Sequence, residues 1–165
     1  MTYYNIAEKI VKAIQAIINP LSQALFPHFS KRSTIIAPDK FKNEILRLSK
    51  YYFIVLFLIS VVIIMLTPLG IRLYLGNENI NIIQDLRIMS FIVIFGGINY
   101  LLGFVGMVNM DKEKDFRTLV ILCGILNILL AIPVSYFFKD TGLSFLLVFI
   151  ELLLFLLLLR KINKV

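Results

Sequence analysis

Polar and charged side chains recur along one face of residues 6–27. Six of them fall within an arc of roughly 100° when the segment is wound as an α-helix: Glu8, Lys12, Gln15, Asn19, Ser22 and Gln23. The ammonium groups of Lys9 and Lys12 attract anions as point charges, and the amides of Gln15, Asn19 and Gln23 donate and accept hydrogen bonds. We therefore predict that these five side chains line a polar cavity, with the alternative that they only satisfy neighbouring helices.

Glu151 lies within the otherwise apolar run of residues 143–159. A carboxylate at that depth in a membrane is costly unless it is paired, protonated or hydrated, so it should face protein or water. It could carry a coupling proton, pair with a lysine elsewhere in an assembly, or accept a hydrogen bond from Asn127. The sequence leaves these alternatives open.

The elements that must position these residues are membrane-spanning helices. A mean hydropathy of +0.90 and a hydrophobic fraction of 59% are too high for a soluble domain with one small core. Four further apolar runs are long enough, or nearly so, to cross the hydrocarbon layer as helices: 51–71, 88–110, 118–138 and 143–159. Residues 6–27 add a span that lines the cavity, or else an amphipathic helix that lies flat in the interface. The predicted fold is all-α: a polytopic membrane helical bundle of about five transmembrane helices, in one unit over residues 1–165.

Basic residues alternate between the connecting segments. Twelve of the 17 lysines and arginines lie in residues 28–50, 111–117 and 160–165. Because lysine and arginine accumulate on the cytoplasmic side, these segments and the carboxyl terminus are predicted to be cytoplasmic and the amino terminus external. The tyrosines near span ends are expected to be interface anchors: Tyr51, Tyr52, Tyr74 and Tyr136. An external amino terminus without a signal peptide, and an odd number of crossings, suggest the carboxyl-terminal part of a longer protein.

Small residues form a stripe on each of two consecutive spans. Gly96, Asn99, Gly103 and Gly106 share a face of 88–110, and Gly124 and Asn127 begin a similar stripe on 118–138. Small residues let helix backbones approach, and asparagine bridges them by hydrogen bonds, so helix packing is the prediction. Pro20, Pro68 and Pro133 are expected to shape their helices.

Several kinds of site lack the necessary residues. The chain has one histidine, His28, and one cysteine, Cys123, in separate apolar contexts. Neither a metal site, a disulfide nor a nucleophile with its base can be assembled from them, so we predict no cofactor and no enzymatic activity. The basic residues occupy short loops without an aromatic-interleaved patch, so nucleic acid is not an expected partner.

Sequence motifs in order along the chain carry a resemblance to a known family. Residues 3–32 read YYNIAEKIVKAIQAIINPLSQALFPHFSKR, and further motifs follow Pro68: LYLG at Leu73 to Gly76, LRIMSF at Leu86 to Phe91, DKEKDFR at 111–117 and GILNILLAIPVSYFF at 124–138. This order resembles bacterial O-antigen and polysaccharide flippases of the multidrug, oligosaccharidyl-lipid and polysaccharide exporter superfamily. The resemblance implies two six-helix bundles around a central cavity, with this chain corresponding to the last five helices.

The resemblance also implies a function and partners. The chain would be part of a transporter in the bacterial inner membrane that flips an undecaprenyl-pyrophosphate-linked oligosaccharide, an O-antigen or capsular repeat unit. Lys9 and Lys12 would attract the pyrophosphate, and the amides would suit sugar hydroxyls. Expected partners are membrane lipid, the lipid-linked oligosaccharide, and the missing amino-terminal half or another membrane subunit. Two alternatives stay open: an accessory or remnant subunit without transport activity of its own, and a drug exporter of the same superfamily, for which an aromatic, acidic cavity is expected.

Overall fold

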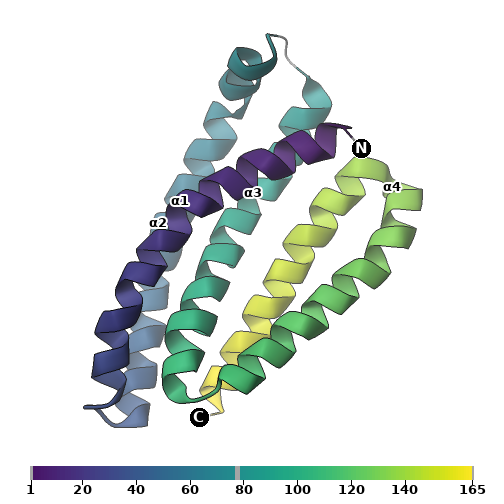
Figure 1. The fold of residues 1–165 in the computed structure, drawn as a ribbon. Helices are drawn as coiled ribbons and strands as arrows, with labels where there is room; N and C mark the ends of the chain where they lie inside the picture. The colour runs from purple at the N-terminus through teal and green to yellow at the C-terminus, as the bar shows by residue number, and fades with distance from the viewer. Residues whose placement is uncertain (1, 77–78, 165) are drawn as a thin grey trace.

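The described chain is a bundle of helices. The computed structural model describes residues 2–76 and 79–164, and these ranges contain no strand. The α-helices are α1 (Thr2–Ser33), α2 (Pro38–Leu75), α3 (Ile80–Tyr100) and α4 (Glu113–Asn163). A π-helix (Leu101–Met107) and a 3-10 turn (Val108–Met110) continue α3 to the connection with α4 (Figure 1). The all-α prediction is therefore confirmed for these residues.

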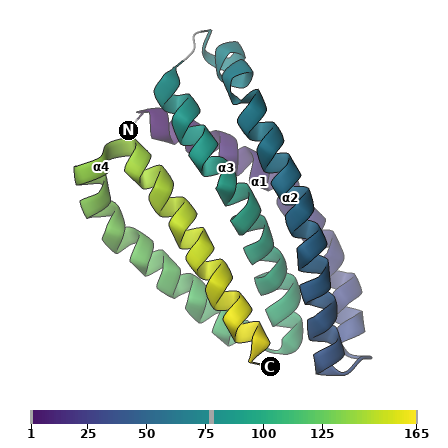
Figure 2. The same ribbon diagram turned by 180° about the vertical axis from the view of Figure 1, so that it is seen from behind.

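Helix α3 is the central element. It lies between α1 and α2 on one side and α4 on the other, and it packs against all three (Figures 1 and 2). In the continuous segment Ile80–Met110, which α3 begins, 67% of the most apolar 18 residues are buried, against 22% in Pro38–Tyr74 and in Glu113–Asn163. The fully buried side chains Met89, Val93 and Leu102 come from this segment. The core of the bundle is thus built around α3, and the outer helices keep apolar faces exposed, as lipid-facing helices do.

Helix α4 consists of two arms that run in opposite directions. Its backbone leaves the helical region at Lys139, with φ 53° and ψ −142°, and the chain then turns back so that its carboxyl terminus lies near the start of α4 (Figures 1 and 2). Residues 113–138 form the first arm and residues 140–163 the second. At the end of the two arms opposite the reversal, Lys161 Nζ lies 3.1 Å from Asp115 Oδ1, and this ion pair joins the arms. The spans expected at 118–138 and 143–159 thus fall one in each arm.

Helix α3 begins earlier than the sequence predicted. The side-chain oxygen of Asn79 accepts hydrogen bonds from the backbone N–H groups of Asn81 (3.1 Å) and Ile82 (3.4 Å). Asn79 thus caps a helix that begins at Ile80, eight residues before the expected start at Ile88. Asp85, expected outside the span, is consequently in the second turn of α3. It is 1% exposed.

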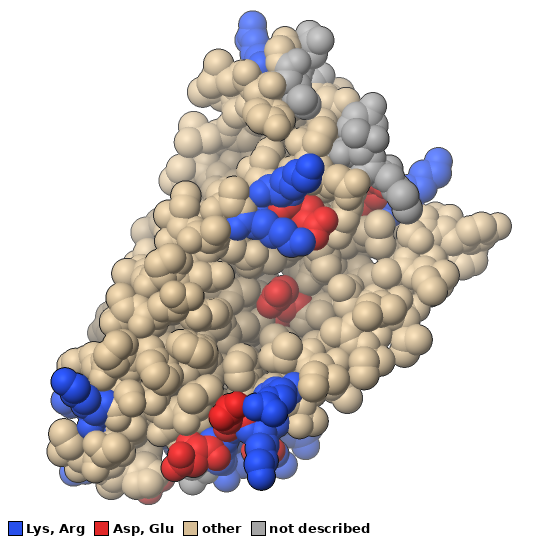
Figure 3. All heavy atoms as spheres, in the orientation of Figure 1, with Lys and Arg blue, Asp and Glu red and all other residues tan. Residues whose placement is uncertain are grey.

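Among the described residues, three segments are long and apolar enough to cross a membrane: Pro38–Tyr74, Ile80–Met110 and Glu113–Asn163. Helix α1 is 32 residues long but carries Glu8, Lys9 and Lys12 in its first half, and it is not among them. The α1–α2 connection, the α3–α4 connection and the carboxyl terminus meet at the same end of the bundle (Figures 1 and 2). The three basic segments therefore share one end, and charged atoms gather there in Figure 3.

Candidate functional site

A polar cavity of about 280 Å³ lies where α1, α3 and both arms of α4 meet. Five of its nine lining residues are polar or charged, and all nine are: Glu8, Val11, Lys12, Gln15, Met89, Ile92, Asn127, Leu147 and Glu151. Figure 3 shows acidic atoms recessed in a hollow between α1 and α4, with uncharged residues around the hollow. The fold thus brings Glu8, Lys12 and Gln15 of α1 together with Glu151 of α4 at one cavity.

Glu151 is held by Asn99 of α3. The Asn99 Nδ2 donates to Glu151 Oε2 at 2.7 Å and to the backbone carbonyl oxygen of residue 151 at 2.8 Å. Asn99 is 4% exposed, so this pair joins α3 to the second arm of α4 in the bundle interior. A hydrogen bond from Asn127 was one of the alternatives that the sequence left open for Glu151; Asn127 lines the same cavity, but the donor is Asn99.

Gly96 lets α1 and α4 approach α3 beside this pair. A Cβ at Gly96 would lie 2.5 Å from Gln15 Nε2 and 3.8 Å from Glu151 Cδ. The Gln15 Nε2 instead fits against α3 and donates to the Ile92 carbonyl oxygen at 3.5 Å. At Gly96 the group that packs closely against α3 is thus a polar side chain of the cavity.

Lys12 lies at the mouth of the cavity. Its Nζ is 2.6 Å from Glu8 Oε1, and the Lys12 side chain is 70% exposed while that of Glu8 is 28% exposed. An exposed pair one helical turn apart contributes only a few tenths of a kcal/mol, about 0.3–0.5. Its main consequence is that the Lys12 charge is partly offset by a carboxylate, which the sequence analysis had not considered.

The other three candidates on α1 do not line the cavity. Lys9 and Gln23 are exposed, and Asn19 is half-buried outside the lining. Helix α1 packs through a face whose members are buried: Ala7, Val11, Ile18 and Ser22. At 3.6 residues per turn, Gln15 lies roughly 50° from the centre of that face, Gln23 roughly 130° and Lys9 roughly 170°. Rotation about the helix axis therefore places Lys9 and Gln23 on the outer surface, whereas Asn19 lies one turn beyond Gln15 along the helix, past the lining of the cavity.

The predicted packing glycines divide into two groups. A Cβ at Gly103 would overlap the Phe116 ring of α4, and one at Gly106 would come 3.1 Å from Ile45 of α2, so both admit a neighbouring helix. A Cβ at Gly124 would meet nothing within 4 Å. The packing role predicted for Gly124 therefore has no counterpart among the described residues, because this side of the first arm faces outward.

Asp85 is a buried acidic residue that the sequence analysis missed. It lines a second cavity, of about 500 Å³, beside the reversal of α4 at Lys139, Asp140 and Thr141. Neither carboxylate oxygen accepts a hydrogen bond from the described residues. The hydroxyls of Thr141 and Ser144 are polar neighbours, but that of Ser144 bonds to the Asp140 carbonyl oxygen at 3.3 Å. The signal that could have revealed Asp85 was Asn79 before an apolar run, a helix-start pattern.

Side-chain contacts at two levels fix α1 to α2. At the basic end, Arg32 Nε and Nη2 donate to Glu44 at 2.5 and 2.6 Å, and these hydrogen bonds raise the pKa of the Arg32 guanidinium. Nearer the middle, Ser22 Oγ donates to the Tyr52 hydroxyl oxygen at 3.0 Å. Tyr52 is 6% exposed, so the expectation that it is an interface anchor is wrong. These contacts join the carboxyl-terminal half of α1 to α2.

The chemistry available in the cavity is polar binding. Amides of Gln15 and Asn127, carboxylates of Glu8 and Glu151 and the Lys12 ammonium offer donors, acceptors and charges of both signs. Among residues 2–76 and 79–164, no group of three or more histidine, cysteine, aspartate or glutamate side chains is placed to hold a metal ion.

The chain was compared with known proteins. No protein-family model matches it, and no solved structure matches it. A protein described as "Putative O-antigen transporter" from Shigella dysenteriae is 28% identical over 160 residues, which are 97% of this chain and 39% of that relative. A protein of the same description from Escherichia coli (strain K12) is 27% identical over 143 residues, 84% of this chain and 33% of that relative.

The chain resembles O-antigen transporters. The resemblance predicted from the sequence motifs is thus confirmed over most of its length, although the chain spans only between a third and two fifths of the length of these relatives. Their names describe transporters rather than enzymes. Together with the three long apolar helices, the likeness supports a multi-pass helical membrane protein.

Proposed function

We propose that the chain is part of a transporter that flips an undecaprenyl-pyrophosphate-linked oligosaccharide, an O-antigen or capsular repeat unit, across the bacterial cytoplasmic membrane. The observation that carries this proposal is a cavity with five polar lining residues inside an apolar bundle, in a chain similar to O-antigen transporters. Sugar hydroxyls and phosphates cross hydrocarbon only where donors, acceptors and charges replace their water.

The size of the cavity bears on how much of the substrate it could hold. Its volume of about 280 Å³ is just below the roughly 300–1,000 Å³ typical of small-molecule sites. It would therefore accommodate only part of an oligosaccharide, and the remaining walls would come from the rest of a transporter with two bundles around a shared site. In this proposal the chain corresponds to the last five of twelve helices. Lys9, Asn19 and Gln23 would then face those additional walls.

The polar residues have separate proposed roles. Gln15 and Asn127 would bind sugar hydroxyls inside the cavity, and Lys12 would attract the pyrophosphate at its mouth despite the neighbouring Glu8. Glu151 would either carry a coupling proton or hold the second arm of α4 on α3 through Asn99. The substitution Glu151→Gln separates these roles: reduced export at normal abundance favours proton coupling, whereas reduced abundance favours packing.

The proposed topology has five crossings: α1, α2, α3 and the two arms of α4. The basic end would be cytoplasmic, which places the carboxyl terminus inside and the amino terminus outside. Single cysteines introduced into a Cys123→Ala background test this arrangement. Those at Lys40 and Asn163 should be protected from an impermeant maleimide in intact cells, and one at Asn79 should be labelled. External labelling at Lys40 would contradict the topology.

Complementation tests the function. The chain would be expressed alone, and joined to the upstream part of a relative, in a host that lacks its own O-antigen transporter. We expect surface polysaccharide only from the joined protein, and Lys12→Ala should lower export more than the matched control Ile14→Ala at equal abundance. Export by the chain alone would contradict the proposal that it is one part of the transporter, and equal export by the two variants would remove Lys12 from the site.

One alternative function has a specific observation behind it. Because the chain spans only 39% and 33% of its relatives, it could be an accessory membrane subunit without transport activity of its own. Failure of the joined protein to restore export would favour that alternative. For a drug exporter an aromatic, acidic cavity is expected: Glu8 and Glu151 supply the acidic groups, but none of the described lining residues is aromatic.

A further inference from the structure

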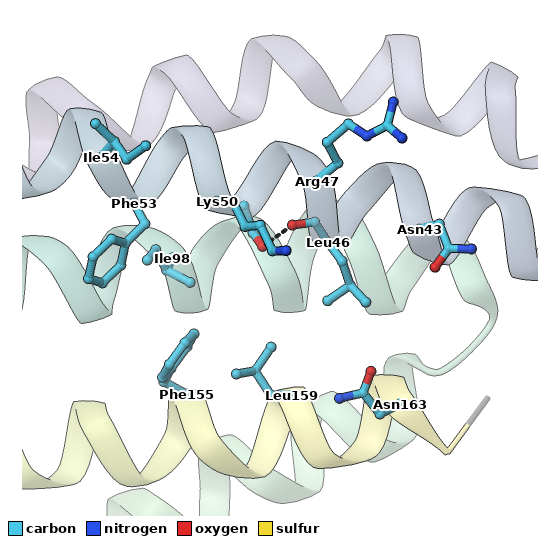
Figure 4. A pocket seen from close by; sticks show the side chains of 11 residues that line it. Asn43, Leu46, Arg47, Lys50, Phe53, Ile54, Ile98, Phe155, Leu159 and Asn163 are labelled. Carbon is cyan, nitrogen blue, oxygen red and sulfur yellow. Dashed lines mark hydrogen bonds between the residues drawn. The ribbon is translucent and has the colours of Figure 1, made fainter.

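A larger groove of about 770 Å³ lies on the side of the bundle, between α2 and the second arm of α4. Both helices pack on α3, and Ile98 of α3 forms its floor (Figure 4). None of its lining residues belongs to the polar cavity described above. The groove is therefore a separate feature, on a surface that hydrocarbon would contact.

The lining changes from polar to apolar along the groove. Asn43, Arg47 and Asn163 lie at one end, Lys50 and Leu159 near the middle, and Phe53, Ile54 and Phe155 at the other end (Figure 4). On α2 the stripe runs from Asn43 to Ile54, which is roughly 16 Å of helix at 1.5 Å per residue. Phe53 and Ile54 are 38% and 54% exposed. A polar end followed by an open apolar channel matches a molecule with a polar head and a hydrocarbon tail.

Two basic side chains line the groove, Arg47 at its polar end and Lys50 near its middle. Both are exposed, and neither lies within ion-pair distance of a described acidic residue. Glu44 binds Arg32 and also interacts electrostatically with Arg47, so the Lys50 charge is the less offset of the two. Arg47 extends from the rim on the side away from α4 (Figure 4). Both residues lie at the basic end of the bundle, where headgroups of one leaflet would surround them. Basic groups at the mouth of a groove between membrane helices attract anionic headgroups, and a phosphate accepts charge-assisted hydrogen bonds from them.

We propose that this groove binds an anionic phospholipid of the membrane. Its headgroup phosphate lies at Lys50 and Arg47, the amides of Asn43 and Asn163 bind the polar part of the headgroup, and one acyl chain lies over Ile98 between α2 and α4. The site is independent of the transported substrate, since it uses other residues on another face.

Quenching of a single tryptophan by brominated lipid tests the proposal, because the chain has no tryptophan of its own. The full chain with Ile54→Trp would be placed in bilayers of phosphatidylcholine with increasing brominated phosphatidylglycerol. We expect stronger quenching than with brominated phosphatidylcholine at equal mole fraction. A chain with Ile121→Trp is the matched control, because Ile121 is 54% exposed on the first arm of α4, away from the groove. It should report no preference between the two lipids.

Charge variants identify the residues responsible. Lys50→Gln and Arg47→Gln in the Ile54→Trp chain should each weaken the apparent affinity for phosphatidylglycerol about fivefold, and about 25-fold together. Lys112→Gln with Lys114→Gln removes two charges at the same end outside the groove and should leave the affinity unchanged. Lys50→Arg keeps the charge and should retain the preference, which guards against a variant that merely fails to fold.

Other outcomes would overturn the proposal. Equal quenching by the two lipids, or a preference that survives loss of both charges, would exclude an anionic site here. Displacement of phosphatidylglycerol by much lower concentrations of undecaprenyl phosphate would assign the groove to the substrate lipid. Absence of quenching by either lipid, with Ile121→Trp quenched normally, would show that protein covers the groove.

Discussion

Asn99→Ala should weaken the attachment of the second arm of α4 to α3 more than Glu151→Ala does. The first substitution removes the donor of both hydrogen bonds, to Glu151 Oε2 at 2.7 Å and to the carbonyl oxygen of residue 151 at 2.8 Å. The second removes only the bond to the carboxylate. Because the backbone bond survives in Glu151→Ala, a double-mutant cycle between the two positions isolates the side-chain bond.

The size of this coupling can be bounded. A hydrogen bond to a charged group contributes about 1.5–3 kcal/mol in soluble proteins. In membrane proteins, interhelical hydrogen bonds measured by such cycles average about 0.6 kcal/mol and reach about 1.7, because the unfolded chain in the membrane also finds partners. Asn99 is 4% exposed and the bond is short, so we expect a coupling between about 0.6 and 1.7 kcal/mol. The extra backbone bond should make Asn99→Ala the costlier single substitution by about 0.5–1.5 kcal/mol.

The single cysteine supplies the assay. Cys123 is 2% exposed and packs in a cluster with Leu146 and Ile150 of the second arm, next to Glu151. Its reaction with a maleimide during a titration with sodium dodecyl sulfate reports the unfolded fraction when the second arm separates, without an introduced label. Free energies of unfolding for the wild type, the two single variants and the double variant then close the cycle.

A distant asparagine gives the control. Asn109 donates to the Val105 carbonyl oxygen of its own helical segment at 2.8 Å, and ten residues of helix place it roughly 15 Å from Asn99 along the axis. Asn109→Ala and Glu151→Ala should therefore be additive within about 0.3–0.5 kcal/mol. If the Asn99 and Glu151 substitutions are equally additive, the two side chains do not bond and this account of the site fails.

Three further predictions concern packing and buried polar groups. Gly103→Ala would place a methyl group in the space of the facing phenylalanine ring of α4 and should lower the free energy of unfolding by about 1–3 kcal/mol; the same titration should show no such loss for Gly124→Ala, and an equal loss would mean that packing is not the cause. Asp85→Asn should leave stability unchanged or raise it by up to about 1 kcal/mol, because the amide can donate where the carboxylate accepts nothing from the described residues; a loss above about 2 kcal/mol would reveal a partner of the carboxylate. Ser22→Ala and Tyr52→Phe should each cost about 1 kcal/mol, and the double variant little more than either alone, since both remove one bond; full additivity in thermal unfolding would argue against that bond.

Sequence alone determined the class of the fold and the main helical segments. Charge-free apolar runs of about 20 residues have few alternatives to membrane helices, because an unpaired backbone group in hydrocarbon costs several kcal/mol. The spacing of glycines on 88–110 also sufficed to predict close packing at Gly96, Gly103 and Gly106, since a face without side chains invites a neighbour. Glu151 was singled out because a carboxylate in an apolar membrane helix is energetically unfavourable. In the structure its carboxylate accepts a hydrogen bond from Asn99.

Tertiary structure decided which of the polar residues meet. The polar arc of α1 is visible in the sequence, but its rotation about the helix axis is set by packing of Ala7, Val11 and Ile18 against the bundle, so Gln15 enters the cavity and Lys9 does not. The donor to Glu151 depended on how α3 lies against the second arm of α4, which local spacing within either helix does not specify. The burial of Asp85 likewise required the early start of α3 and the reversal of α4 at Lys139. Helical periodicity is a property of neighbours in the chain, whereas these contacts join residues 52 or more positions apart, and only the packed bundle brings them together.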